Sequence, residues 1–365
     1  MNSQRASIKF NNKLFGLELV RFISAIAVLV WHYQHFSFVA DKSLNFQREK
    51  QPFYSILAIF YEYGHFGVQI FWAISGFIFF WKYGNLIAAK DLGFKKFFAL
   101  RFTRLYPLHF ATLLLAALLQ SIYFSQKNYY FVLQDNDIPH FILQLFLASG
   151  WGLEKGASFN GSIWSVSVEI LIYIFFFLNF KGFGNRFIIN FGVVTLCLIA
   201  KLLKLSNPVI DCLAFFYIGG ITATAFYYFQ DKKYKVIADS VCISLLVALP
   251  PLAYVTGYYE HRGFAQLVLL IYLPALIFMS AYDLSMPISA QKVISAAGNM
   301  TYSSYLIHFP LQILIAIYFA KVNESIPYYS PVFFLVFMAL TLTASYYIYR
   351  FFEAPAQMYL RIKMA

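Results

Sequence analysis

The sequence is poor in charged residues, since Asp, Glu, Lys and Arg together make up only 12% of its 365 residues. Soluble globular domains carry roughly 25% charged residues, because a folded body needs polar surface that faces water. Hydrophobic residues instead reach 61%, and no hydrophilic stretch is long enough to form a soluble domain. The composition therefore excludes an ordinary water-soluble protein and indicates an integral membrane protein.

Cysteine is also scarce, with three residues in the whole chain and no CxxC spacing. Cys197, Cys212 and Cys242 all lie in or beside apolar segments, which argues against a disulfide framework or a zinc site. We therefore predict no metal site. The first apolar segment is long and has no small-residue cleavage site, so we interpret it as a retained helix rather than a signal peptide.

Apolar segments recur along the chain, and a membrane-spanning helix needs about 20 largely apolar residues. They predict an all-α, polytopic membrane helix bundle of about ten spans, which we treat as a single domain over residues 1–365 without a fused soluble domain. The predicted spans are 16–38, 66–83, 105–125, 164–180, 187–204, 209–229, 236–256, 264–282, 301–320 and 332–352. The apolar segment 138–150 is too short to span and is predicted to be an interfacial or re-entrant helix.

The formal net charge is +12, carried mostly by short connections between the apolar segments. If the N-terminus is cytoplasmic, the inner connections hold roughly twice as many Lys and Arg residues as the outer ones, as the positive-inside rule requires. Ten spans with both termini in the cytoplasm satisfy this bias. The basic charge is thus explained by topology and by anionic ligands, and we expect the lipid bilayer, not nucleic acid, as the partner.

The first predicted span carries ionisable residues, which are costly in a bilayer and therefore candidates for function. One helical face carries residues that step by three and four: Glu18, Arg21, Ala25, Val28, His32 and His35. Arg21 and His32 are eleven residues apart, or roughly 16 Å along the helix axis. A structural interpretation also fits, with a Glu18–Arg21 ion pair and a hydrogen-bonded His32.

Basic residues cluster in the predicted connection before the third span, at Lys95, Lys96, Arg101 and Arg104. Arg101 and Arg104 share one helical face, and two guanidinium groups side by side suit phosphate oxygens. Ordinary positive-inside charge or contact with anionic lipid headgroups would explain the same pattern.

Polar residues also mark the fourth and ninth predicted spans. Ser165, Glu169 and Tyr173 step by four and face the same way, close to Trp164. Such a carboxylate either lines a wet cavity or pairs with a buried Arg or His. In the ninth span, Tyr302, Tyr305 and His308 step by three and form a polar edge, for which hydrogen bonds between helices are the expected role. Glu353, which closes the last span, is interpreted as structural.

These clusters, taken in order, resemble the membrane acyltransferase family 3 along nearly the whole chain. The resemblance is carried by Arg21-Phe22 followed by His32, by Gly67-Val68 through Phe71 and Ile74 through Phe77, by the Arg101–Pro107 segment RFTRLYP, by Trp164 through Glu169, by Tyr302 through His308, and by Glu353-x-Pro355.

The resemblance implies an O-acyltransferase that moves an acyl group, commonly acetyl from cytoplasmic acyl-CoA, onto a hydroxyl of a carbohydrate or glycolipid acceptor. It implies His32 as the catalytic histidine, with Glu169 as a second catalytic candidate, and Arg21, Arg101 and Arg104 as donor-binding residues. Trp164, Ser165, Tyr305 and His308 would contact the acceptor or support the site. Acyl-CoA is then a substrate, with no permanently bound cofactor.

In this mechanism the donor runs up a water-accessible passage from the arginines to His32, and Glu169 orients His32 or holds the acceptor. The expected location is a bacterial inner membrane. A transporter or flippase, or a membrane scaffold with buried structural polar residues, remains an alternative, although no two-fold hydropathy repeat is visible.

Overall fold

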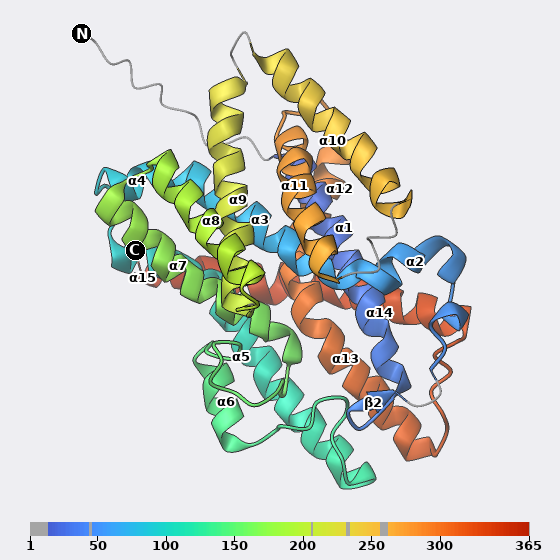
Figure 1. Cartoon of the computed structure of the whole chain (residues 1–365). Helices are drawn as coiled ribbons and strands as arrows, with labels where there is room; N and C mark the ends of the chain where they lie inside the picture. The colour runs from blue at the N-terminus through green and yellow to red at the C-terminus, as the bar shows by residue number, and fades with distance from the viewer. Residues whose placement is uncertain (1–13, 44–45, 206, 231–233, 256–261, 365) are drawn as a thin grey trace, which may run out of the picture.

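The computed structural model describes residues 14–43, 46–205, 207–230, 234–255 and 262–364. For residues 253 and 262–267 it describes the backbone alone. The described chain is an all-α bundle (Figure 1) whose β structure is one antiparallel pair, β1 (Phe38–Val39) with β2 (Lys42–Ser43). The predicted fold class is confirmed.

A helix coincides with each of the ten predicted spans. Eight helical stretches within the described residues are long and apolar enough to cross a membrane, while 187–202 and 268–280 are shorter apolar helices. Many large apolar side chains point outward, as expected of a surface that faces lipid. The ten helices are α1 (Phe15–His32), α3 (Gly67–Phe79), α5 (Phe94–Lys127), α7 (Trp164–Phe183), α8 (Phe187–Leu202), α9 (Pro208–Phe229), α10 (Lys235–Val255), α11 (Arg262–Ser280), α13 (Thr301–Val322) and α14 (Pro331–Ile348).

The third span begins earlier than the sequence predicts. Helix α5 starts at Phe94 rather than at residue 105, so Arg101 and Arg104 lie inside the helix and not in the connection before it. Charged side chains lower the hydropathy, so a span predicted from hydropathy stops at them. The helix itself continues where neighbouring helices, rather than lipid, surround the charged side chains. The prediction that Arg101 and Arg104 lie in the connection before the third span is therefore wrong.

The segment between α5 and α7 folds back along the bundle. Its helix α6 (Ile138–Leu145) begins at Asp137, whose carboxylate accepts the His140 backbone N–H. The Gln144 carbonyl lies 2.8 Å from Nε2 of His109, a residue about 27 Å before the end of α5. Helix α6 therefore packs against the middle of α5, and the interfacial or re-entrant character of this segment stays a prediction.

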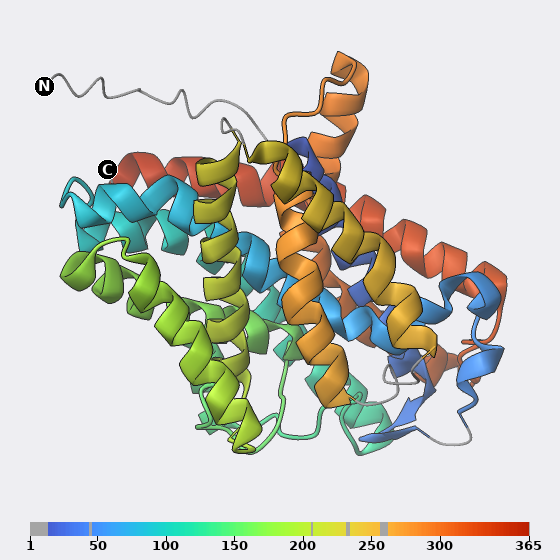
Figure 2. The same cartoon turned by 45° about the horizontal axis from the view of Figure 1, so that its top comes forward.

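The remaining helices are short or polar, and the hydropathy pattern did not predict them. They are α2 (Tyr54–Tyr63), α4 (Asn85–Ala88), α12 (Ile288–Asn299) and α15 (Ala354–Met364). Helix α12 projects from one end of the bundle (Figure 2).

The interior is organised around α3, which packs most extensively against α9. Their backbones touch at two glycines: a Cβ at Gly219 would lie 1.8 Å from the Ala73 carbonyl oxygen, and one at Gly76 would lie 1.8 Å from that of Phe216. Small residues at such crossings let membrane helices approach closely enough for extensive packing. The close approach holds α3, and the polar residues on it, at the centre of the bundle.

Replacing Gly219 by alanine is expected to destabilise the protein by about 1–3 kcal/mol, because the added methyl group forces the two helices apart. Thermal unfolding in detergent micelles measures the effect. Gly192→Ala in α8 is the matched control, since nothing lies within 4 Å of its added Cβ and helix propensity favours the change. Equal melting temperatures for the two variants would contradict the role given to Gly219.

Two π-helical turns, Phe80–Gly84 after α3 and Tyr349–Glu353 after α14, interrupt otherwise continuous helices. Such turns occur frequently at functional sites, because the extra residue redirects the side chains around it. The first turn places the Tyr83 hydroxyl against Arg101, and the second buries Glu353 against Ser303.

Candidate active site

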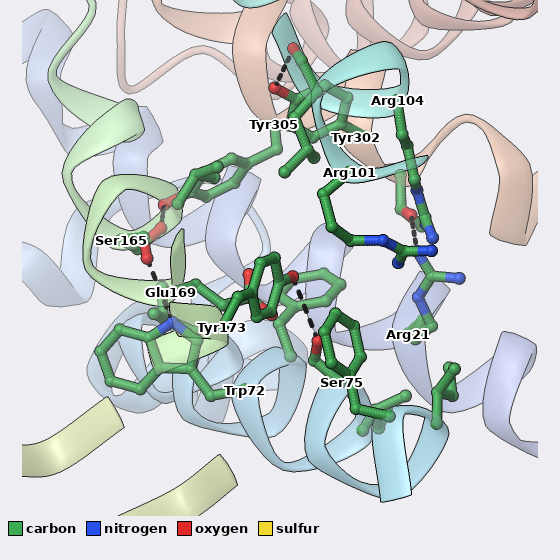
Figure 3. A pocket seen from close by; sticks show the side chains of 18 residues that line it. Arg21, Trp72, Ser75, Arg101, Arg104, Ser165, Glu169, Tyr173, Tyr302 and Tyr305 are labelled. Carbon is green, nitrogen blue, oxygen red and sulfur yellow. Dashed lines mark hydrogen bonds between the residues drawn. The ribbon is translucent and has the colours of Figure 1, made fainter. Parts of the chain in front are cut away.

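Helices α1, α3, α5, α7 and α13 enclose a central cavity, shown from close by in Figure 3. Three guanidinium groups and one carboxylate line it. The charged and polar residues of its wall are Arg21, Ser75, Arg101, Arg104, Ser165, Glu169, Tyr173, Thr301, Tyr302 and Tyr305.

The three arginines gather on one side of this cavity (Figure 3). Arg21 forms an ion pair with Glu18, with Nη1 and Oε2 3.1 Å apart, and its Nη2 donates to the Thr301 hydroxyl at 3.3 Å. The predicted Glu18–Arg21 pair is confirmed, and it leaves Arg21 in the cavity wall.

Arg101 is 7% exposed and is held by aromatic rings. Its Nη2 donates to the Tyr83 hydroxyl at 2.5 Å, and its guanidinium carbon lies 5.0 Å from the Phe79 ring centre and 4.9 Å from that of Tyr83. Its Nε is buried with no partner in the part of the chain that the structure describes. A buried donor without an acceptor is costly, so this group is suited to a ligand that brings one.

Arg104 lies one turn further along α5 and is half-buried. Within the described residues it makes no hydrogen bond and no ion pair within 4.0 Å. Two of the three cavity arginines therefore have unused donors that point to an anionic ligand, and paired guanidinium groups bind phosphate oxygens with several hydrogen bonds.

Glu169 lies across the cavity from the arginines (Figure 3) and accepts hydrogen bonds from the hydroxyls of Ser75 and Tyr173. The Ser75 and Tyr173 hydroxyls are also 3.3 Å from each other. As predicted, Ser165, Glu169 and Tyr173 face one way and share the cavity. No hydrogen bond joins Glu169 to His32 among the described residues, so direct orientation of His32 by this carboxylate has no support.

A hydrogen bond of 2.7 Å between the hydroxyls of Ser165 and Tyr305 joins two walls of the cavity. Nε1 of Trp72 donates to the Ser165 carbonyl at 3.3 Å, and Trp164 packs edge-on against Trp72 with ring centres 5.8 Å apart. Trp164 itself is not in the cavity wall. Its role is to brace α7 against α3.

His32 lies outside the wall of the central cavity, in a cluster of aromatic and imidazole rings. Its ring centre is 4.8 Å from that of His308, 4.9 Å from that of His35 and 4.8 Å from that of Trp31. The predicted passage from the arginines therefore does not reach His32 as one open cavity, because α13 places Tyr305 and then His308 between them.

Hydrogen bonding selects the tautomer of His32. Nδ1 lies 2.9 Å from the Val28 carbonyl oxygen, which only accepts, so Nδ1 carries the proton. Nε2 then has a free lone pair and, in the described residues, no hydrogen-bond partner. Nδ1 of His308 is held in the same way by the Ser304 carbonyl at 3.2 Å, with Nε2 3.4 Å from the Ser162 hydroxyl.

The polar edge of α13 joins helices, as the sequence predicts. Tyr302 donates to the Leu105 carbonyl at 2.8 Å, Tyr305 contacts Ser165, and His308 contacts Ser162. These contacts tie α13 to α5 and to the start of α7, and they bring His308 against His32.

Several residues that the structure places in the site were not predicted from the sequence. Gln312 donates to the His32 carbonyl at 2.9 Å, and its Oε1 is 3.2 Å from Nδ1 of His35. It lies four residues after His308, so extending the polar edge of α13 by one turn would have found it. Ser75 lies within the Ile74–Phe77 motif of the resemblance, but the motif gave it no role. Tyr83 carried no signal, because a single hydroxyl in an apolar segment is common.

Residues 14–350 match the family of acyltransferase domains. A stretch of 177 residues is 27% identical to the acyltransferase MdmB of Streptomyces mycarofaciens, and it covers 46% of this chain and 40% of that protein. The chain therefore spans less than half the length of this relative. No solved structure matches the chain.

Proposed function

Because this chain belongs to the family of acyltransferase domains, we propose that it is a membrane O-acyltransferase. In this proposal it transfers an acyl group, most often acetyl, from cytoplasmic acyl-CoA to a hydroxyl of a carbohydrate-type acceptor. The acceptor is a cell-surface polysaccharide or its lipid-linked precursor, and the membrane is the bacterial inner membrane.

The observation that carries the proposal is the combination of a phosphate-type anion site with a histidine of suitable tautomer. The unused donors of Arg101 and Arg104 suit the phosphates of a coenzyme A donor. The unprotonated Nε2 of His32 suits a general base, because it has a free lone pair.

The spacing of the two sites supports this donor. The pantetheine arm has about the backbone length of four peptide residues, or roughly 14 Å when extended. Arg21 and His32 are separated by roughly 16 Å along α1. A donor with its diphosphate at the arginines therefore brings its thioester to the neighbourhood of His32, provided that the Ser165–Tyr305 hydrogen bond opens to let the arm pass.

The proposed chemistry uses Nε2 of His32 as the base. It takes the proton of the acceptor hydroxyl while the oxygen attacks the thioester carbonyl, and the coenzyme A thiolate leaves and receives a proton. Alternatively Nε2 attacks the thioester carbonyl and takes the acyl group while the coenzyme A thiolate leaves. In a second step the acceptor hydroxyl takes the acyl group from Nε2, and its proton goes to the thiolate. In both routes the Val28 carbonyl holds the ring through Nδ1, while Gln312 holds the backbone carbonyl of His32. The acceptor approaches from the loops at 39–65 and 126–163.

The test incubates purified protein with radiolabelled acetyl-CoA and candidate glycans. The expected result is transfer of label to the glycan together with release of free thiol. A transporter, a flippase or a scaffold would do neither, so the absence of both products with every donor and glycan tried would contradict the proposed function.

A further inference from the structure

A second cavity lies beside α12, the helix that projects from one end of the bundle in Figure 2. It is bounded by α12, by the beginning of α1 and by the end of α14 with its π-helical turn. Its lining includes the basic residues Lys292 and Arg350 and the aromatic residues Phe15, Tyr346 and Tyr349. None of these residues has a role in the proposed acyl-transfer mechanism.

The second cavity adjoins the arginine side of the central cavity through the junction of α12 and α13. Asn299 lines the second cavity, while Thr301, two residues later, lines the central one and accepts a hydrogen bond from Arg21. Gly298, just before Asn299, packs so closely on Glu18 that a Cβ would lie 2.0 Å from Oε2. The Glu18–Arg21 pair therefore stands between the two cavities.

The charge of the second cavity favours an anion. Two cations line it against one carboxylate, Asp283. Neither Lys292 nor Arg350 forms an ion pair within 4.0 Å in the described part of the chain, and both side chains are exposed. Nη1 of Arg350 donates to the Tyr346 hydroxyl at 3.0 Å, and its guanidinium carbon lies 5.6 Å from the Phe351 ring centre. Its other N–H groups have no hydrogen-bond acceptor within the described residues.

The three aromatic rings add a second kind of recognition. Nucleic-acid bases bind proteins by stacking on aromatic side chains, and each base has a face that can do so. The π-helical turn supplies Tyr349 and Arg350 to this cavity, while Glu353 at its end turns inward to Ser303. Aromatic rings beside cations that form no ion pair are a combination that suits a phosphorylated nucleoside.

The position along α1 matches the order of groups in coenzyme A. Phe15 precedes Arg21 by six residues, or about 9 Å, on the side away from His32. A donor whose thioester points to His32 and whose diphosphate meets Arg21 therefore has its nucleoside end near Phe15.

We propose that the second cavity binds the adenosine 3′-phosphate end of the acyl-CoA donor. Lys292 and Arg350 contact the 3′-phosphate, and the rings of Phe15, Tyr346 and Tyr349 flank the adenine. This assignment rests on the proposed function, since it takes acyl-CoA as the donor.

The first experiment measures binding without turnover. Adenosine 3′,5′-bisphosphate is titrated by calorimetry into the purified full chain in detergent micelles. We expect binding to the natural protein, and dissociation constants raised about tenfold in each of Lys292→Ala and Arg350→Ala. Lys181→Ala is the control, because Lys181 is exposed at the end of α7 and lies outside both cavities. No binding at millimolar concentration, or equal binding by all variants, would overturn the assignment.

The second experiment separates this assignment from the proposed function. Acetyl-CoA, 3′-dephospho-acetyl-CoA and S-acetyl-phosphopantetheine are compared as donors. We expect KM about tenfold higher for the two truncated donors, and KM for acetyl-CoA raised to a similar extent in Lys292→Ala with little change in kcat. Equal KM values for the three donors would overturn the nucleoside site and leave the acyltransferase intact. Transfer from none of them would overturn the proposed function itself.

Discussion

Replacing His32 by alanine is expected to abolish acyl transfer while the protein still folds and still binds coenzyme A. General-base catalysis contributes about 10²–10⁴-fold to a rate, and the loss of Nε2 removes it entirely. Donor affinity is expected to remain, because His32 lies outside the cavity wall that holds the arginines. The effect should therefore fall on kcat and leave the dissociation constant of coenzyme A unchanged.

The measurement is single-turnover transfer from labelled acetyl-CoA, together with calorimetric binding of coenzyme A. His140→Ala is a useful control, because this histidine pairs with Asp137 at the start of α6, away from both the cavity and His32. His308→Ala tests whether loss of a ring that only contacts His32 also lowers the rate. The ring centre of His308 lies 4.8 Å from that of His32, but Nε2 of His308 faces Ser162. A His32→Ala protein with more than a tenth of the normal rate would remove His32 from the mechanism.

Replacing Arg104 by alanine is expected to weaken coenzyme A binding by about 10- to 100-fold at unchanged protein stability. A hydrogen bond to a charged group contributes about 1.5–3 kcal/mol, and each 1.4 kcal/mol corresponds to a factor of ten in affinity. Stability should not change, because Arg104 makes no hydrogen bond within the described residues. Arg104→Lys should restore only part of the affinity, since an ammonium group cannot present two parallel donors.

Calorimetric titration with coenzyme A at fixed ionic strength measures this effect, and thermal unfolding measures stability in parallel. Arg186→Ala is the matched control, because Arg186 is an exposed arginine between α7 and α8. Coenzyme A affinity that is the same in the Arg104→Ala protein and the natural one would show that the donor does not bind in the central cavity. A lowered melting temperature in Arg104→Ala alone would point instead to a structural role.

The family predicted from the order of the motifs is confirmed by the match over residues 14–350. The ten predicted spans all coincide with helices, because a run of about 20 apolar residues is a local property that can be read along the chain. Helix α12 was not predicted from hydropathy, because a polar helix that projects from the bundle contains no long apolar run. The start of α5 was misplaced for a related reason, because buried arginines interrupt the apolar run while the helix continues.

The candidate site was predicted less completely than the spans. Helical periodicity placed Arg21 and His32 on one face of α1, and both lie on that helix. This periodicity could not show that Arg21 reaches the cavity and His32 does not. The residues that separate His32 from the cavity, Tyr305 and His308, come from another helix, α13. Glu169 was likewise predicted to face a polar space, but its partners Ser75 and Tyr173 became evident only when α3 and α7 were packed together.

The sequence by itself determined that the chain lies in a membrane, which long apolar segments are helical and which faces of α1, α7 and α13 are polar. These properties depend on composition and on spacing along one helix, where neighbours are three and four residues apart. Tertiary structure alone decided which polar faces meet, because that depends on how closely helices distant in the sequence approach, as α3 and α9 do at Gly76 and Gly219. It thereby separated the arginine cavity from the histidine cluster and formed the second cavity beside α12.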